Sequence, residues 1–166
     1  MKPIVAILVG AVLVLAGCAA TVSSRVTAGM TEPDVLRIGG KPAREQKLVS
    51  GEITWDYTLQ PSGYFTWRVV FAPDGRVREV RNLTTYANSL NIAEGMTEAQ
   101  VEEIMGPTFI REKYWLGTYS IGYRYMDDAI FMMLTVIMSK DGRVTGYTWQ
   151  PDNIMYDAVS GGEGHR

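Results

Sequence analysis

Residues 28–35 read AGMTEPDV, and nearly the same pattern returns at residues 94–101 as EGMTEAQV, 66 positions further along the chain. Downstream of the first copy, DGRV at 74–77 returns at 141–144. Segments that recur in the same order at almost the same offset indicate an internal duplication. The sequence therefore predicts two tandem modules that are built alike, the first over 27–85 and the second over 86–152.

Each copy of the GMT segment has the pattern of a helix start. Thr31 and Thr97 stand at N-cap positions, and Gln100 completes a capping box with Thr97. A Gly-Gly pair at 39–40 and a Gly-Pro pair at 106–107 are helix-ending signals. Helices of about eight residues are too short to be stable alone, so each is expected to pack on the rest of its module.

The sequence after each helix alternates apolar and polar residues, which is the pattern of half-buried strands. The segments with this pattern are 53–60, 64–71 and 77–83 in the first copy, and 119–126, 129–138 and 143–149 in the second. Turn-forming residues separate them. We therefore expect an α+β fold with two tandem modules, each a short helical segment followed by a three-stranded antiparallel β-meander. The helices should cover one face of each sheet.

The first seventeen residues have the features of a lipoprotein signal peptide. Lys2 precedes an apolar stretch over 4–15, which is too short to span a bilayer but has the length of a signal-peptide core. LAGC at 15–18 matches the bacterial lipobox, whose cysteine accepts the lipid, and Cys18 is the single cysteine in the chain. We predict that residues 1–17 are removed and that Cys18 anchors the protein to a membrane.

The lipobox also predicts how the remaining chain is arranged. A tether is expected over 18–26 and a C-terminal tail over 153–166, where Gly residues are frequent. Ala19, rather than an aspartate, follows the cysteine, and this favours the outer membrane with the protein facing the periplasm. Retention at the inner membrane stays open.

The string Gly-Met-Thr-x-x-x-Val, followed by Gly near Pro, aromatic strands and an Asp-Gly turn, resembles the SmpA/OmlA (BamE-like) family of small outer-membrane lipoproteins. The resemblance covers nearly all of the mature chain, once per copy, whereas the BamE-like protein has one such domain. It implies an α-α-β-β-β fold and a non-catalytic role as a scaffold or accessory in envelope assembly, with barrel-assembly components as partners. The tandem arrangement also resembles the β-lactamase inhibitor protein. The residues that match the family are Gly29, Met30, Thr31, Gly95, Met96 and Thr97. They are structural, because they cap and orient the helix, so no partner-binding residue is carried over from the family.

Few residues suit catalysis. The single histidine, His165, lies in the Gly-rich tail, and Cys18 is assigned to the lipid. The carboxylate pairs at 127–128 and 102–103 are interpreted as turn formers and as a solvated helix face. With 16 Lys and Arg against 18 Asp and Glu, the chain has no charge excess for nucleic acid. We predict a protein that is not an enzyme and that has no metal, no cofactor and no nucleic-acid partner.

The strand predicted over 129–138 is apolar on both faces, so something must cover its second face. The other module, the C-terminal segment 154–159 or a partner protein could do so. If the face is open, an apolar patch there marks a partner site. We hypothesise that this site consists of Phe131, Met133 and Ile137, with Tyr147 or Trp149 nearby. The alternative function is that of an inhibitor or binding module, which blocks a periplasmic or secreted enzyme through its sheet face.

Overall fold

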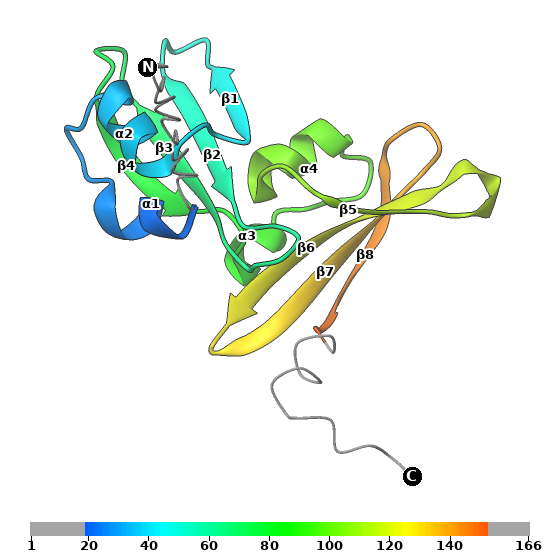
Figure 1. The fold of residues 1–166 in the computed structure, drawn as a ribbon. Helices are drawn as coiled ribbons and strands as arrows, with labels where there is room; N and C mark the ends of the chain where they lie inside the picture. The colour runs from blue at the N-terminus through cyan, green and yellow to red at the C-terminus, as the bar shows by residue number, and fades with distance from the viewer. Residues whose placement is uncertain (1–18, 153–166) are drawn as a thin grey trace, which may run out of the picture.

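The computed structural model describes residues 19–152, which form two four-stranded antiparallel sheets with short helices (Figure 1). The α+β class with two β modules is confirmed. The first sheet has the order β1-β2-β3-β4 and the second the order β5-β6-β7-β8. No helix within 19–152 is long and apolar enough to cross a membrane. In chain order, the elements are α1 (Ala19–Arg25), α2 (Glu32–Gly39), β1 (Arg44–Lys47), β2 (Ile53–Thr58), β3 (Thr66–Phe71), β4 (Val77–Asn82), α3 (Tyr86–Ser89), α4 (Glu98–Met105), β5 (Ile110–Lys113), the 3-10 turn η1 (Trp115–Gly117), β6 (Tyr119–Asp127), β7 (Ile130–Met138) and β8 (Val144–Pro151).

Each sheet has one strand more than the predicted meander of three. The additional strands, β1 and β5, lie at the sheet edges and pair antiparallel with β2 and β6. They read REQK and IREK, so they lack the apolar alternation by which a strand is recognised. Charged side chains are common on edge strands because they oppose pairing with other chains. The charged residues therefore protect these edges from pairing with other chains, and they also explain why the sequence pattern does not predict these strands.

The helix ends form as the sequence predicts. At α4 the Gln100 N–H donates to Thr97 Oγ1 (3.3 Å), and the Thr97 N–H donates to Gln100 Oε1 (2.9 Å), which completes the capping box. At α2 the Thr31 N–H donates in the same way to Asp34 Oδ2 (3.2 Å). The helices end at Gly40 and Gly106, whose φ values of 69° and 86° lie in the region that favours glycine.

The core of the first module lies between its helices and the inner face of its sheet. Val22 of α1 and Val35 of α2 pack with apolar side chains of β2 and β3, among them Trp55, Val69 and Phe71. The structure differs from the lipid tether expected over 18–26, because Ala19–Arg25 form α1, and Val22 and Val26 belong to this core. Val22 is 0% exposed and Val26 is 4% exposed.

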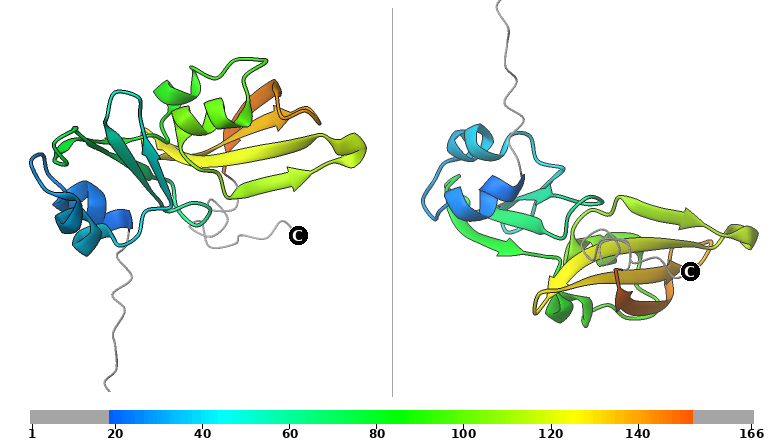
Figure 2. Two further views of the ribbon diagram at one scale, coloured as in Figure 1. Left: turned by 90° about the horizontal axis from the view of Figure 1, so that it is seen from above. Right: turned by 60° about the horizontal axis from the view of Figure 1, so that its bottom comes forward.

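The second module repeats this arrangement. Val101 and Met105 of α4 pack against the inner face of β6 and β7, where Ile121, Leu134 and Val136 are fully buried. Figure 2 shows α3 and α4 on one side of the long β6–β7 hairpin. The inner face of the second sheet is therefore covered by helices of its own module.

Helix α4 also covers the outer face of the first sheet, so it lies between the two sheets (Figure 1). Thr66, Arg68 and Val70 point to this outer face, and all three are buried. The sequence predicts a largely solvated face here because its residues are polar. The layers of the molecule are α1 with α2, the first sheet, α4, and the second sheet.

A buried charge network holds α4 against the first sheet. The Asp56 carboxylate accepts hydrogen bonds from Arg44 Nε (2.9 Å) and from Arg68 Nε (2.7 Å) and Nη2 (3.0 Å). The same guanidinium groups donate to the last carbonyls of α4: Arg44 to Glu102 O (2.8 Å) and Arg68 to Glu103 O (3.1 Å). Cations are favourable at a helix C-terminus because the helix dipole is negative there.

The network also adds ion pairs to the helix face that was expected to be solvated, where the Glu103 side chain is 47% exposed and that of Glu102 is 26% exposed. The Glu103 carboxylate pairs with Arg68, and Glu102 lies 3.8 Å from Arg44. Burial lowers the pKa of Arg68, but the hydrogen bonds and negative charges of Asp56 and Glu103 outweigh burial and raise it above its ordinary value. Arg68 therefore remains charged although its side chain is 1% exposed.

A second contact between the modules comes from the loop that joins β2 and β3. The Gln60 side chain accepts from the Arg124 N–H (3.1 Å) and donates to the Arg124 carbonyl (2.6 Å), which satisfies the backbone of β6 beyond its pairing with β5. Tyr64 packs on Phe131 with ring centroids 4.7 Å apart, and its hydroxyl donates to Asp152 Oδ2 (3.1 Å). This loop covers the Phe131 end of the second sheet.

Candidate functional site: the open face of the second sheet

The outer face of the second sheet is the face turned away from α3 and α4, and we call it the open face. Its central row crosses the sheet through Ile110, Gly122, Thr135 and Thr148, which are paired in register. Within residues 19–152 no helix lies over this row (Figure 2). Among residues 19–152, the contact that covers this face is the packing of Tyr64 on Phe131.

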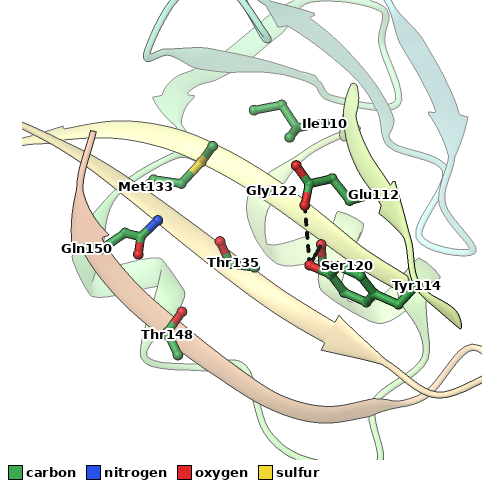
Figure 3. A pocket seen from close by; sticks show the side chains of 9 residues that line it. All are labelled: Ile110, Glu112, Tyr114, Ser120, Gly122, Met133, Thr135, Thr148 and Gln150. Atoms are coloured by element: carbon green, nitrogen blue, oxygen red, sulfur yellow. Dashed lines mark hydrogen bonds between the residues drawn. The ribbon is translucent and has the colours of Figure 1, made fainter. Parts of the chain in front are cut away.

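A hollow of about 280 Å³ lies on the open face (Figure 3). Gly122 and Thr135 lie at the centre of its lining. A Cβ on Gly122 would lie 2.8 Å from Ile110 Cγ2, so the Ile110 side chain fills the space above this glycine. The complete lining is Ile110, Glu112, Tyr114, Ser120, Gly122, Met133, Thr135, Thr148 and Gln150.

Three polar side chains meet at one end of the hollow. The hydroxyls of Tyr114 and Ser120 are 2.9 Å apart, and the Tyr114 hydroxyl donates to Glu112 Oε2 at 3.4 Å (Figure 3). Thr135, Thr148 and Gln150 offer further hydroxyl and amide groups along the hollow. The lining is therefore suited to hydrogen bonding with the polar groups of a partner, and it has one acidic group, Glu112.

The turn between β5 and β6 projects two large apolar side chains at the end of the open face. Trp115 is 85% exposed and Leu116 is 81% exposed. Leu116 has a φ of 71°, which is unfavourable for a residue with a branched side chain, and the turn is closed by a hydrogen bond from the Tyr114 N–H to Thr118 O (2.9 Å). We call Tyr114, Trp115 and Leu116 the aromatic tip. The sequence signal for it is a Trp-Leu pair followed by a turn-forming glycine.

The structure brings together some of the residues hypothesised to bind a partner and separates others. Phe131, Met133 and Ile137 lie on the open face, in positions that alternate with the buried Leu134 and Val136. Phe131 is packed under Tyr64, Met133 lines the hollow, and Ile137 is 37% exposed. The first module therefore covers the Phe131 end of this strand, while Ile137 at the other end is partly exposed.

Tyr147 and Trp149 lie on the opposite face. Both pack against the core of the second module, and Trp149 Nε1 donates to Ser89 Oγ (2.9 Å). They cannot join Met133 and Ile137 in one surface, because the sheet separates them.

The structure brings no metal-binding set together within residues 19–152, where no group of three or more His, Cys, Asp or Glu side chains is placed to hold an ion. Asp127 ends β6, and Asp128 and Ala129 form the hairpin turn with φ values of 42° and 68°. The turn-former interpretation of this acidic pair therefore agrees with its position. Cys18 and His165 lie outside the described residues.

Sequence comparisons give no family. The sequence matches no protein-family model, and no curated protein matches it. Among solved structures, one described as an osmotically inducible lipoprotein, OsmE, is similar with a TM-score of 0.35 and 19% identity, over 47% of this chain and 87% of that chain. A likeness this weak carries no argument about function.

Proposed function

We propose that the protein is a lipid-anchored, non-enzymatic component of the bacterial envelope that binds other proteins through the open face and the aromatic tip. The lipobox at 15–18 supports the anchor. The exposure of Trp115 and Leu116 beside an open, hydrogen-bonding hollow supports protein binding, and this is the observation that carries the proposal.

The aromatic tip has the composition of a binding hot spot. Aromatic side chains dominate the energy of protein interfaces, and burying a large apolar side chain contributes about 1.5–3 kcal/mol. The backbone of the tip adds a second argument, because Leu116 is held at a positive φ where a smaller polar residue would be less strained. Polar groups in the hollow would then orient the partner that the tip anchors.

The finer parts of the proposal rest on the sequence. Ala19 after the lipobox cysteine favours the outer membrane, and the resemblance to the SmpA/OmlA family favours a scaffold or accessory role in envelope assembly. Barrel-assembly components are the partners that we propose to test first.

Affinity purification after crosslinking tests partner binding. The lipidated protein with a C-terminal affinity tag is crosslinked in cells, and detergent extracts are analysed by mass spectrometry. We expect a defined set of envelope proteins that is lost in a Trp115→Ser, Leu116→Asn variant, since asparagine tolerates the positive φ. Val49→Ser is the matched control, because Val49 is a fully exposed apolar residue in the turn between β1 and β2. Equal recovery from all three proteins would overturn the proposal.

Replacing Cys18 tests the anchor. We expect the Cys18→Ser protein to incorporate no labelled fatty acid and to leave the membrane fraction. Membrane association that persists without acylation would show that another part of the chain holds the protein there.

A further inference from the structure

The two modules use equivalent positions for their helices and sheets. In the first sheet Arg44, Asp56 and Arg68 form one row across β1, β2 and β3, and in the second sheet Ile110, Gly122 and Thr135 form the matching row. Isolated bridges attach Thr31 to Arg76 and Thr97 to Arg143, next to the two helices. An offset of 66 residues therefore relates α2 to α4, Arg44 to Ile110 and Asp56 to Gly122, and an offset of 67 relates Arg68 to Thr135.

Within the chain, the first sheet already shows what binds to this kind of face. Its outer row receives the end of α4, where Glu102 and Glu103 meet Arg44 and Arg68. The next turn approaches so closely that a Cβ on Gly106 would lie 2.6 Å from Thr66 Cγ2. The face accepts the C-terminal turn of the helix from the following module.

Within residues 19–152, the two outermost layers each have one face on which no further layer packs. One such face is the open face of the second sheet. The other is the outer side of α2, where Leu36 is 43% exposed and the Arg37 side chain is 75% exposed. By the 66-residue offset, Leu36 and Arg37 correspond to Glu102 and Glu103, the two residues of α4 that contact Arg44 and Arg68 of the first sheet.

The residues on the two outermost faces differ from their counterparts in the internal interface, and the changes on one face match those on the other. Inside the chain, an acidic helix end meets a basic row. On the outermost faces, Leu36 takes the place of Glu102 while Ile110 takes the place of Arg44, so an apolar pair replaces an ion pair. Arg37 takes the place of Glu103, and the sheet offers Thr135 with the carboxylate of Glu112 in the same hollow. At one position on each side the charge is therefore of opposite sign to that in the internal interface: Arg37 on the helix and Glu112 on the sheet.

We propose that the open face binds helix α2 of a second copy of this chain, head to tail, in the manner in which the first sheet binds α4. This inference rests on the proposed function of the open face as a protein-binding surface, and it names one partner. Leu36 packs on Ile110, and Arg37 leaves its exposed pair with Asp34 for Glu112; such a surface pair costs little to give up. The interface is heterologous, so each added copy presents a new open face.

Sedimentation of the mature chain, residues 18–166 with Cys18→Ser, tests the proposal. We expect weight-average mass to rise with concentration between about 10 µM and about 500 µM, as for weak association. Leu36→Asp and Ile110→Asp should each weaken association at least about tenfold. Val49→Asp is the exposed control and should leave association unchanged. Unfolding midpoints of all variants show that they are folded.

Charge exchange and crosslinking then test the pairing. Arg37→Glu and Glu112→Lys should each weaken association, and a mixture of these two chains should restore it. A short bis-maleimide should link a Leu36→Cys chain to an Ile110→Cys chain, each in the Cys18→Ser background, and should link neither to itself.

Three outcomes would overturn the inference. The first is a monomer at every concentration, and the second is crosslinking of Leu36→Cys chains to each other. The third is association that appears only after removal of residues 153–166, which would assign the open face to that segment. If self-association is absent but Trp115→Ser still loses its envelope partners, the inference fails while the proposed function stands.

Discussion

Replacing Arg68 with methionine tests how strongly the buried charge network ties the modules together. The substitution removes two hydrogen bonds to Asp56 (2.7 and 3.0 Å), one to the Glu103 carbonyl (3.1 Å) and one to the Glu103 carboxylate, while it keeps an unbranched side chain. Breaking a buried ion pair usually costs about 3–5 kcal/mol, because one charge is left without its partner. Asp56 keeps Arg44 (2.9 Å), so we expect a smaller loss of about 2–4 kcal/mol in the free energy of unfolding.

Urea unfolding, followed by tryptophan fluorescence, measures this loss. The matched control is Arg78→Met on β4 of the same sheet, where the Arg78 side chain is 53% exposed and pairs with Glu52. An exposed pair contributes about 0–1 kcal/mol, so the control should change little. If Arg68→Met costs no more than Arg78→Met, the network does not hold the layers together. An Asp56→Asn, Arg68→Met double variant should cost less than the sum of the two single variants, because no buried charge is then left unpaired.

Two further predictions concern the junction between the modules. Gly106→Ala should lower the free energy of unfolding by about 2–3 kcal/mol, because the added methyl group would meet Thr66 and the φ of 86° is unfavourable for alanine. Gly95 has a similar φ of 84° but no atom within 4 Å of an added Cβ, so Gly95→Ala should cost only about 1 kcal/mol. Thermal unfolding compares the two variants, and equal losses would show that the contact with Thr66 does not contribute. Burial and the Asp152 charge raise the pKa of Tyr64 to about 12 from 10.0, so the unfolded phenol ionises first and Tyr64 contributes stability that is complete below pH 10 and lost as pH rises toward 12. Tyr64→Phe should therefore unfold with a shallower pH dependence between pH 10 and 12 in an alkaline denaturation series, and an unchanged dependence would refute the assignment.

Local signals in the sequence predicted the elements that have strong local chemistry. Thr31 and Thr97 cap their helices, and the DG turns separate the strands as expected. The edge strands β1 and β5 were missed because their residues are charged, and strand formation there depends on pairing with a neighbour rather than on alternation.

The placement of Tyr147 and Trp149 shows a different reason for failure. The pairing between β7 and β8 shifts between Ile137 and Met138, so that Gly146 and Val144 take successive partners and Thr145 is left over. A bulge of this kind reverses which side chains face the core. Alternation counted from the buried Val144 would place Tyr147 and Trp149 outside, while the bulge turns them inward.

The outer face of the first sheet could not be predicted from its own residues. Asp56 and Arg68 have the polarity of a solvated face, and only the packing of α4 makes them interior. The aromatic tip was missed for the opposite reason, because Trp115 and Leu116 have the polarity of a core while the turn holds them in solvent.

If the protein is anchored through Cys18 as we propose, the position of α1 determines how far it can reach from the membrane. With Cys18 acylated, the folded body begins at Ala19, so about 3.5 Å of chain separates the lipid attachment from the first helix. A protein anchored in this way, as we propose, would diffuse in a layer close to the bilayer surface. Confinement to a surface raises the local concentration of anchored molecules relative to one another, so a contact that is weak in solution can become well populated between neighbours on the same membrane.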